Sequence, residues 1–204
     1  MNWFRRAGLA GLYRLTRWLE TEESELLLEM VFPETDKLVE VPELASGYRF
    51  RFYREEDHEA YQRLMAAADM GECPMGYWRQ HWLPDGFFVI EEVSTGELVA
   101  ACFASHHPSE RHPMAGNFGW LAVDPGHGGK GLGFAISAAV TARLQSGGYK
   151  RIYLETHDHR LSALSIYLKL GWLPLIYHPE LEARWRGVFN ALGLDFDPSD
   201  WVWK

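Results

Sequence analysis

The chain contains the stretch Trp120-Leu121-Ala122-Val123-Asp124-Pro125-Gly126-His127-Gly128-Gly129-Lys130-Gly131-Leu132-Gly133-Phe134-Ala135. A short apolar run meets a Pro-Gly turn, then glycines, then a helical pattern, which predicts a strand, a loop and a helix. The first N–H groups of a helix lack intrahelical partners and carry partial positive charge. Glycines let the main chain approach an anion closely. We therefore expect a site for a phosphate-bearing cofactor.

Two common phosphate loops fit this stretch poorly. A P-loop requires Ser or Thr after Gly-Lys, but Gly131 follows Gly129-Lys130. A dinucleotide loop requires Gly-x-Gly-x-x-Gly, but Ile136 occupies the third glycine position after Gly131-Leu132-Gly133. Glu155 stands at the end of the next predicted strand, where a dinucleotide site needs an acid. A nucleotide-binding oxidoreductase therefore stays open as an alternative.

A third loop type fits better. The segment resembles the acyl-CoA motif of the GNAT superfamily of N-acetyltransferases, Val-x-Pro-x-x-(Arg/Gln)-x-x-Gly-x-(Gly/Ala). Val123, Pro125, Gly131 and Gly133 match it, whereas Gly128 stands where Arg or Gln is usual. The family mostly uses main-chain N–H groups of this loop on the pyrophosphate, so binding does not depend on that side chain. Neighbouring Lys130 or His127 is expected to replace part of the lost contact.

A second segment, residues 160–172, resembles the GNAT signature Asn-x-x-Ala-x-x-(Leu/Ile)-Tyr-x-Lys-x-Gly-Phe. Trp172 replaces the final Phe, and Arg160 replaces the first Asn, which contacts the cofactor in the family. The matching residues are Ala163, Ile166, Tyr167, Lys169 and Gly171. The two motifs occur in the family's order, with one predicted strand between them. The resemblance extends over about residues 48–177.

The resemblance implies a fold of the α/β (α+β) class, with a GNAT-like mixed, mostly antiparallel central sheet flanked by helices. It implies an acyl-CoA-dependent N-acyltransferase that moves acetyl from acetyl-CoA directly to an amine. Tyr167 would protonate the leaving sulfur, and an N–H at a bulge within residues 120–123 would polarise the thioester carbonyl. The implied cofactor-binding residues are Leu121, Ala122, Val123, Gly128, Gly129, Lys130, Gly131, Leu132, Gly133, Phe134 and Arg160.

The general base is not evident in the sequence. At the positions where family members often carry Glu or His, this chain has Asn117, Phe118 and Gly119, which accept no proton at neutral pH. A water chain to bulk solvent is an equal alternative to a dedicated base. The other candidates are Glu155, His157, His159, His106, His107 and His112. His157-Asp158-His159 resembles a metal-ligand cluster, but a further ligand is not evident, so we expect no metal.

Composition narrows the function classes. The 204 residues carry a formal net charge of −8, which argues against non-specific nucleic-acid binding and is compatible with a cationic acceptor. Cys73 and Cys102 form no disulfide framework, so we expect a cytoplasmic protein. No apolar run has the length of a membrane span. The expected partner is a small-molecule or peptide amine. The second hypothesis for the function, beside the N-acyltransferase, is a GNAT-like module that binds CoA or a partner without catalysis.

We expect the chain to divide into an N-terminal extension, residues 1–45, and an acyltransferase domain, residues 46–204. Residues 3–19 suggest a basic amphipathic helix, and residues 26–45 an irregular or partly extended connection. Strands are expected at 48–52, 87–92, 98–105, 118–123, 151–156 and 173–177, and helices at 55–68, 77–83, 132–144, 161–170 and 181–192. Residues 201–203 suggest a terminal strand. Loops at 66–83 and 106–117 are expected to form the acceptor pocket, and a homodimer is compatible with the aromatic tail and the N-terminal helix.

Overall fold

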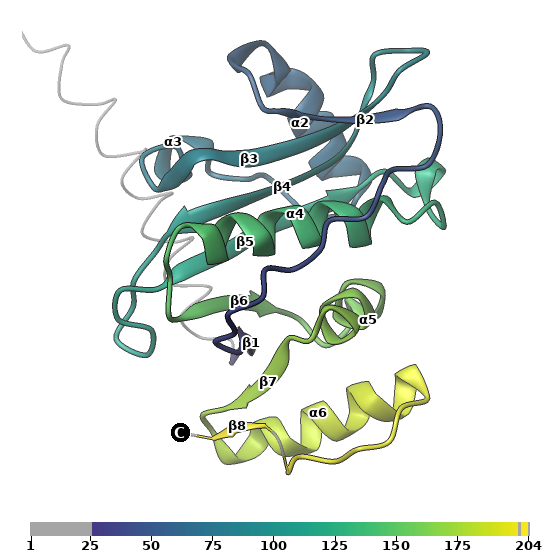
Figure 1. Ribbon diagram of the computed structural model, residues 1–204. Coiled ribbons are helices and arrows are strands. Elements are labelled where there is room, and N and C mark those ends of the chain that lie inside the picture. The colour runs from purple at the N-terminus through teal and green to yellow at the C-terminus, as the bar shows by residue number, and fades with distance from the viewer. Residues whose placement is uncertain (1–25, 200, 204) are drawn as a thin grey trace, which may run out of the picture.

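The computed structural model describes residues 26–199 and 201–203. The helix expected at residues 3–19 lies outside the described residues. The elements run in the order shown in Figure 1. They are β1 Leu28–Phe32, β2 Tyr48–Phe52, η1 Glu55–Asp57, α2 His58–Ala67, α3 Met75–Trp78, β3 Trp82–Glu92, β4 Leu98–His106, β5 Gly116–Val123, η2 Pro125–His127, α4 Leu132–Ser146, β6 Ile152–Thr156, α5 Leu161–Leu170, β7 Leu173–Ile176, α6 Pro179–Leu192 and β8 Val202–Trp203.

The strands form one sheet in the order β2-β3-β4-β5-β6-β1-β7-β8. Strands β2 to β5 pair antiparallel in succession, and β1 is antiparallel to both β6 and β7. The β5–β6 and β7–β8 pairs are parallel. The expected mixed, mostly antiparallel sheet flanked by helices is therefore confirmed.

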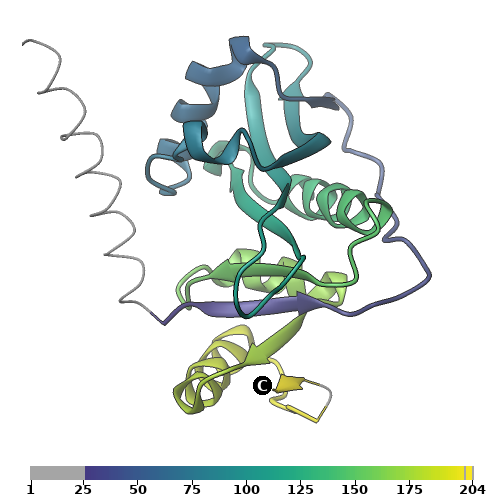
Figure 2. The same ribbon diagram turned by 90° about the vertical axis from the view of Figure 1, so that its left-hand side faces the viewer.

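Helices cover both faces of the sheet because its strands alternate apolar side chains between two cores. Val89 and Phe103 pack with α2 and α3, whereas the neighbouring Ile90 and Cys102 pack with α4 and α5. Figure 2 shows α2 and α4 on opposite sides of the strands between them. The sheet is thus buried on both faces at its centre, where β4 has eight buried residues out of nine.

Strand β1 lies in residues 26–45, where the sequence suggested an irregular or partly extended connection and not a strand of the sheet. All five of its residues are buried, and it lies in the sheet between β6 and β7. Glu29 interrupts the apolar pattern of residues 28–32, so the sequence did not predict a buried strand there. The carboxylate of Glu29 is buried because His112 Nε2 lies 2.6 Å from its Oε2 and Arg111 Nε lies 3.0 Å from its Oε1. A charge paired in this way is tolerated in a core.

The structure does not have the helix expected at 77–83, but a shorter one that begins two residues earlier. Helix α3 ends at Trp78, and β3 already begins at Trp82. The apolar spacing of this segment fits either element, and tertiary pairing decides between them, because Trp82 lies opposite Ser105 of β4. The Trp82 ring also contacts the Phe87 ring edge-on, with centroids 4.8 Å apart.

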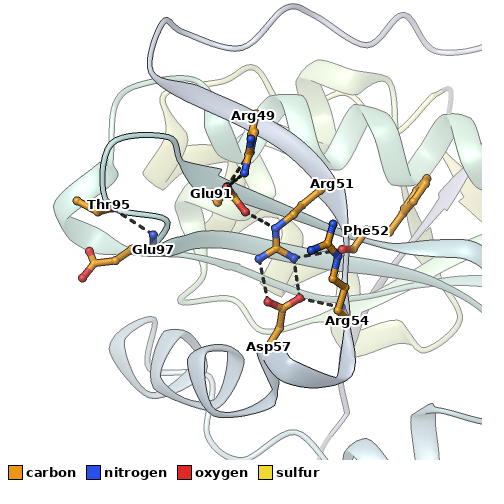
Figure 3. A network of polar contacts seen from close by, with 8 residues as sticks. All are labelled: Arg49, Arg51, Phe52, Arg54, Asp57, Glu91, Thr95 and Glu97. Atoms are coloured by element: carbon orange, nitrogen blue, oxygen red, sulfur yellow. Dashed lines mark hydrogen bonds and ion pairs between the residues drawn. The ribbon is translucent and has the colours of Figure 1, made fainter.

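Charged side chains join β2 and β3 to the start of α2, as Figure 3 shows. Arg51 Nη1 and Nη2 lie 2.6 and 2.8 Å from the two carboxylate oxygens of Asp57, and Arg51 Nε contacts Glu91. Arg49 Nε also donates to Glu91 over 2.7 Å. These hydrogen bonds from Arg51 lower the pKa of Asp57 and of Glu91 below their usual values. The network fixes α2 against the sheet.

We predict that Glu91→Gln lowers the free energy of unfolding by about 2 kcal/mol, because two guanidinium groups lose a largely buried carboxylate. Carboxyl groups whose pKa is depressed in the folded state stabilise it above their unfolded values of about 4, and this contribution is lost as the pH falls. Urea titrations from pH 7 to 3 should therefore show a smaller loss of stability for Glu91→Gln than for the wild type. The exposed Glu97→Gln is the control, and equal losses in both variants would contradict the prediction.

Candidate functional site

A cavity of about 840 Å³ lies where β5 and β6 separate. The two strands pair only at Gly116 with Ile152 and at Asn117 with Tyr153. Beyond this point β5 continues to Val123 and β6 to Thr156 without pairing to each other, although β5 stays paired with β4 and β6 with β1. The cavity is lined by both strands, the glycine loop, the first turns of α4 and α5, and the segment after α2. Its volume lies within the range of small-molecule sites, roughly 300–1,000 Å³.

The glycine loop offers main-chain donors to this cavity. Gly129 and Gly131 have φ angles of +73° and +75°, a conformation that favours glycine, and a Cβ on either would meet nothing within 4 Å. The amide of Gly128 donates to the Pro125 carbonyl over 3.2 Å. The amides from Gly129 to Phe134 have no acceptor within residues 26–199 and 201–203. This row of open N–H groups at the start of α4 suits an anion.

Gly133 has a different reason to be glycine. It lies in the first turn of α4, and a Cβ there would come within 2.9 Å of Ile166 Cδ1 on α5. The missing side chain therefore lets the two helices pack closely at the wall of the cavity.

Most of the expected cofactor-binding residues meet at the cavity. Ten expected site residues line it, namely Leu121, Val123, Gly128, Gly129, Gly131, Leu132, Gly133, Phe134, Arg160 and Tyr167. Ala122 and Lys130 do not line it. Ala122 is buried in the core with α2 and α3, and Lys130 Nζ donates to the Tyr48 hydroxyl over 2.6 Å.

The strand before the loop carries a bulge. Ala122 lies opposite Ala101 and Gly119 opposite Phe103, so two residues, Trp120 and Leu121, face the single residue between them on β4. Trp120 has φ +57°, which is uncommon for a residue with a large side chain. A bulge leaves main-chain groups outside the ladder. Trp120 and Leu121 both line the cavity, so these groups lie at its wall.

Tyr167 lies on α5 and is only 5% exposed. Its ring meets Phe118 of β5 edge-on, with centroids 5.3 Å apart, and lies 6.3 Å from the Trp172 ring. Burial raises the pKa of Tyr167 above its usual value, so the phenol keeps its proton throughout the physiological range. It can only act as a neutral hydrogen-bond donor or acceptor there.

Arg160 precedes α5 and lines the cavity, but its side chain is directed at the far wall. Its guanidinium contacts the sulfur of Met70, in the segment between α2 and α3. Arg160 therefore spans the cleft to the segment after α2. Ala67 at the end of α2, Ala68, Asp69 and Met70 after it, and Trp78 at the end of α3 also line the cavity. All five fall within residues 66–83, whose role as part of the acceptor pocket stays a prediction.

Three of the candidate bases lie at the cavity, and these are Glu155, His157 and His159. Glu155 is exposed and stands on β6 after its pairing with β5 has ended. His157 and His159 stack with ring centroids 5.3 Å apart. Asp158 between them pairs instead with Arg184, so the three side chains do not converge. Within the described part of the chain, no three His, Cys, Asp or Glu side chains gather as metal ligands.

The loop histidines do not line the cavity, contrary to the expectation that residues 106–117 form its acceptor wall. Of residues 106–117, only Asn117 on β5 lines the cavity. His106 Nδ1 lies 3.0 Å from the Tyr149 hydroxyl. His107 lies between the hydroxyls of Tyr77 and Tyr153, at 2.8 and 2.9 Å. Burial, with smaller contributions from neighbouring histidines, lowers the pKa of His107.

His112 is likewise held in the interior. Arg151 Nε lies 2.9 Å from its Nδ1, and its Nε2 lies 2.6 Å from Glu29. A guanidinium can only donate, so Nδ1 accepts and the proton sits on Nε2. His112 therefore serves the packing of β1 and has no position from which to act as a base in the cavity.

The sequence did not point to Leu27 and Thr156, which also line the cavity. Leu27 immediately precedes β1, and Thr156 ends β6. Neither stands in a recognisable motif, and only the position of β1 beside β6 brings Leu27 to the site.

None of the helices in the described ranges is long and apolar enough to cross a lipid bilayer.

Residues 41–172 match the family model described as "Acetyltransferase (GNAT) family". Among curated proteins, a mycothiol acetyltransferase from Thermobispora bispora is 30% identical over 180 residues, which cover 81% of this chain and 58% of that protein. A mycothiol acetyltransferase from Salinispora tropica is 27% identical, with 84% and 56% covered. The chain therefore spans less than two thirds of the length of these relatives.

Solved structures show the same fold. A GCN5-related N-acetyltransferase from Sphaerobacter thermophilus matches with a TM-score of 0.56 and 18% sequence identity. The match covers 78% of this chain and 53% of that one. At this identity the likeness concerns the arrangement of strands and helices.

Proposed function

Because this chain belongs to the acetyltransferase (GNAT) family, we propose that it transfers an acetyl group from acetyl-CoA directly to an amine. The observation that carries the proposal is the row of open amides from Gly129 to Phe134, at the wall of a cleft that also holds Tyr167. Because the chain belongs to this family, the alternative hypothesis of a nucleotide-binding oxidoreductase, which rested on the glycines and Glu155, is dropped.

The residues present fit acetyl-CoA. The open amides and the positive end of α4 suit a diphosphate, and no side chain projects at Gly129 and Gly131 to obstruct it. Leu121 and Val123 offer main chain along one wall of the cleft for the pantetheine arm. Bound acetyl-CoA supplies the activated acetyl group as a thioester.

Two groups of the protein act on that thioester. A main-chain N–H of the Trp120–Leu121 bulge donates to the carbonyl oxygen, where negative charge develops during attack. The Tyr167 hydroxyl donates to the sulfur as the carbon–sulfur bond breaks. A phenol whose pKa exceeds that of a thiol, about 8.5, donates a hydrogen bond more readily than a whole proton. The proton that the sulfur finally keeps is a second one, which the nitrogen releases after it has bonded to the carbonyl carbon.

We assign Glu155 as the group that takes the proton from the amine. Its carboxylate lies at the cavity on β6, across the cleft from the β5 bulge. A carboxylate that withdraws the ammonium proton leaves the neutral amine, which alone attacks the carbonyl. Asp69 also lines the cavity, and two acidic side chains favour a cationic acceptor, which we propose to be a small-molecule or peptide amine.

We further propose residues 46–204 as the acyltransferase unit, with β1 adding a strand from the preceding segment. The cytoplasm is the proposed location, in keeping with the buried free thiols of Cys73 and Cys102. A homodimer is proposed for solution, and light scattering after gel filtration tests it.

The test of the proposed function is release of the CoA thiol in the presence of acetyl-CoA and a panel of amines, read with a thiol-reactive dye. Transfer predicts release that depends on one class of amine, with a matching acetylated product by mass spectrometry. A protein that binds acetyl-CoA by calorimetry and releases no thiol with any amine would instead be a binding module.

We predict that Gly131→Ala raises the dissociation constant for acetyl-CoA about tenfold. A Cβ at φ +75° costs roughly 1–2 kcal/mol, and the loop relieves it by turning its amides out of line. Isothermal titration measures the effect. Gly96→Ala is the matched control, since Gly96 has φ +73° and open space but lies in the β3–β4 turn. Equal affinities for Gly131→Ala and the control would contradict the prediction.

A further inference from the structure

A hydrogen-bonded chain of three side chains adjoins the glycine loop. Lys130 Nζ lies 2.6 Å from the hydroxyl oxygen of Tyr48, which lies 2.9 Å from His127 Nδ1. Tyr48 is the first residue of β2, and the Tyr48 and His127 rings meet edge-on at 5.8 Å. Residues about 80 positions apart in the chain are thus brought together beside the open amides.

The chemistry of the three groups sets the direction of the chain. An ammonium group has no lone pair, so Lys130 donates to Tyr48. The phenolic hydrogen then has one acceptor among the described residues, His127 Nδ1. An imidazole that accepts at Nδ1 in its neutral form carries its hydrogen on Nε2. The chain therefore ends on an N–H donor of His127.

This donor stands at the cavity. His127 lines it, together with Gly128 and Gly129, while Lys130 does not. Nδ1 is engaged by Tyr48, so Nε2–H is the polar group that this ring has left for a ligand in the cavity. The neighbouring carboxylate of Asp124 accepts from the Gly126 amide over 2.7 Å. Donors in a hydrogen-bonded chain polarise one another, so the charge of Lys130 strengthens the donor at His127.

We propose that His127 Nε2–H binds a phosphate group of the cofactor, and that Tyr48 and Lys130 are its positioning residues. This rests on the proposed function, since it requires CoA in the cavity. It names the side chain that replaces the Arg or Gln absent at Gly128. The phosphate is either the diphosphate or the 3′-phosphate of CoA, and both have the anionic oxygens that an imidazole N–H recognises.

Calorimetric titration of the wild type and of His127→Ala with CoA, dephospho-CoA and pantetheine tests the proposal. We expect His127→Ala to weaken CoA binding about tenfold, or about 1.4 kcal/mol, and to leave pantetheine binding unchanged. A loss that persists with dephospho-CoA assigns the contact to the diphosphate. A loss that vanishes with dephospho-CoA assigns it to the 3′-phosphate.

Tyr48→Phe keeps the ring and removes the hydroxyl, so it tests positioning separately. We expect about threefold weaker CoA binding, unchanged pantetheine binding, and a shift of the His127 ¹⁵N resonances away from the pure Nε2–H pattern. The matched control is Tyr149→Phe, which removes another tyrosine–histidine hydrogen bond, to His106, outside this cavity. It should bind CoA like the wild type.

Three results would overturn the inference. They are equal CoA affinities of the wild type and His127→Ala, an equal loss for CoA and pantetheine, or a wild-type His127 that carries its proton on Nδ1. Each leaves wild-type binding of CoA intact, and with it the proposed function. A wild-type protein that binds none of the three ligands would refute both.

Discussion

Glu155→Gln is expected to lower kcat by roughly 100- to 10,000-fold, the range typical of a positioned general base. The glutamine amide has nearly the size of the carboxylate and cannot take a proton from the ammonium group of the acceptor. Because Glu155 is exposed on β6, the substitution should leave the fold and the acetyl-CoA affinity unchanged. Steady-state CoA release gives kcat, and calorimetry gives the affinity.

Glu97→Gln is the control, since it removes an exposed carboxylate in the β3–β4 turn, and it should behave as the wild type. The assignment of Glu155 fails if Glu155→Gln keeps its kcat. Proton removal would then belong to water or to His157 or His159, which also line the cavity. A fall in acetyl-CoA affinity equal to the fall in kcat/KM would likewise mark a binding role.

Tyr167→Phe should lower kcat about 100-fold with little change in acetyl-CoA affinity. The ring keeps its contacts with Phe118 and Trp172, and only the donor to the departing sulfur is lost. The size of the deficit should depend on the leaving group. An acetyl donor whose thiol is more acidic needs less help at sulfur, so its turnover should fall less.

The matched control for Tyr167→Phe is again Tyr149→Phe, which removes a partly buried hydroxyl away from the cavity. An equal fall in kcat with acetyl-CoA and with the donor whose thiol is more acidic would show that the substitution acts through packing. Unchanged kcat with acetyl-CoA would make Tyr167 a residue of the core, where its burial alone accounts for it.

Local patterns were enough to predict the elements that build the cleft. The run from Trp120 to Ala135 predicted β5, the loop and α4, and glycine at 129 and 131 is required there by positive φ. The segment 160–172 predicted α5 with Tyr167 on it. These features depend on residues close in sequence, because turn chemistry and helical spacing act over a few positions.

Contacts between distant residues lay beyond such patterns. The burial of Glu29 in β1 depends on Arg111 and His112, some 80 residues later. The direction of Arg160 depends on Met70, and that of His127 on Tyr48. The loop histidines were plausible bases by residue type, and their tyrosine, glutamate and arginine partners remove them from the site.

The amino-acid sequence alone thus determined the family, the strand–loop–helix at the cleft and the place of Tyr167, because each is encoded within a few neighbouring residues. Only the tertiary structure decided which carboxylates and imidazoles line the cavity, because the cavity itself exists only where β5 and β6 separate after two paired residues. It also brought Leu27, just before β1, to the cavity and Tyr48 of β2 to His127, since long-range pairing is selected by the burial of whole faces and leaves no local signal.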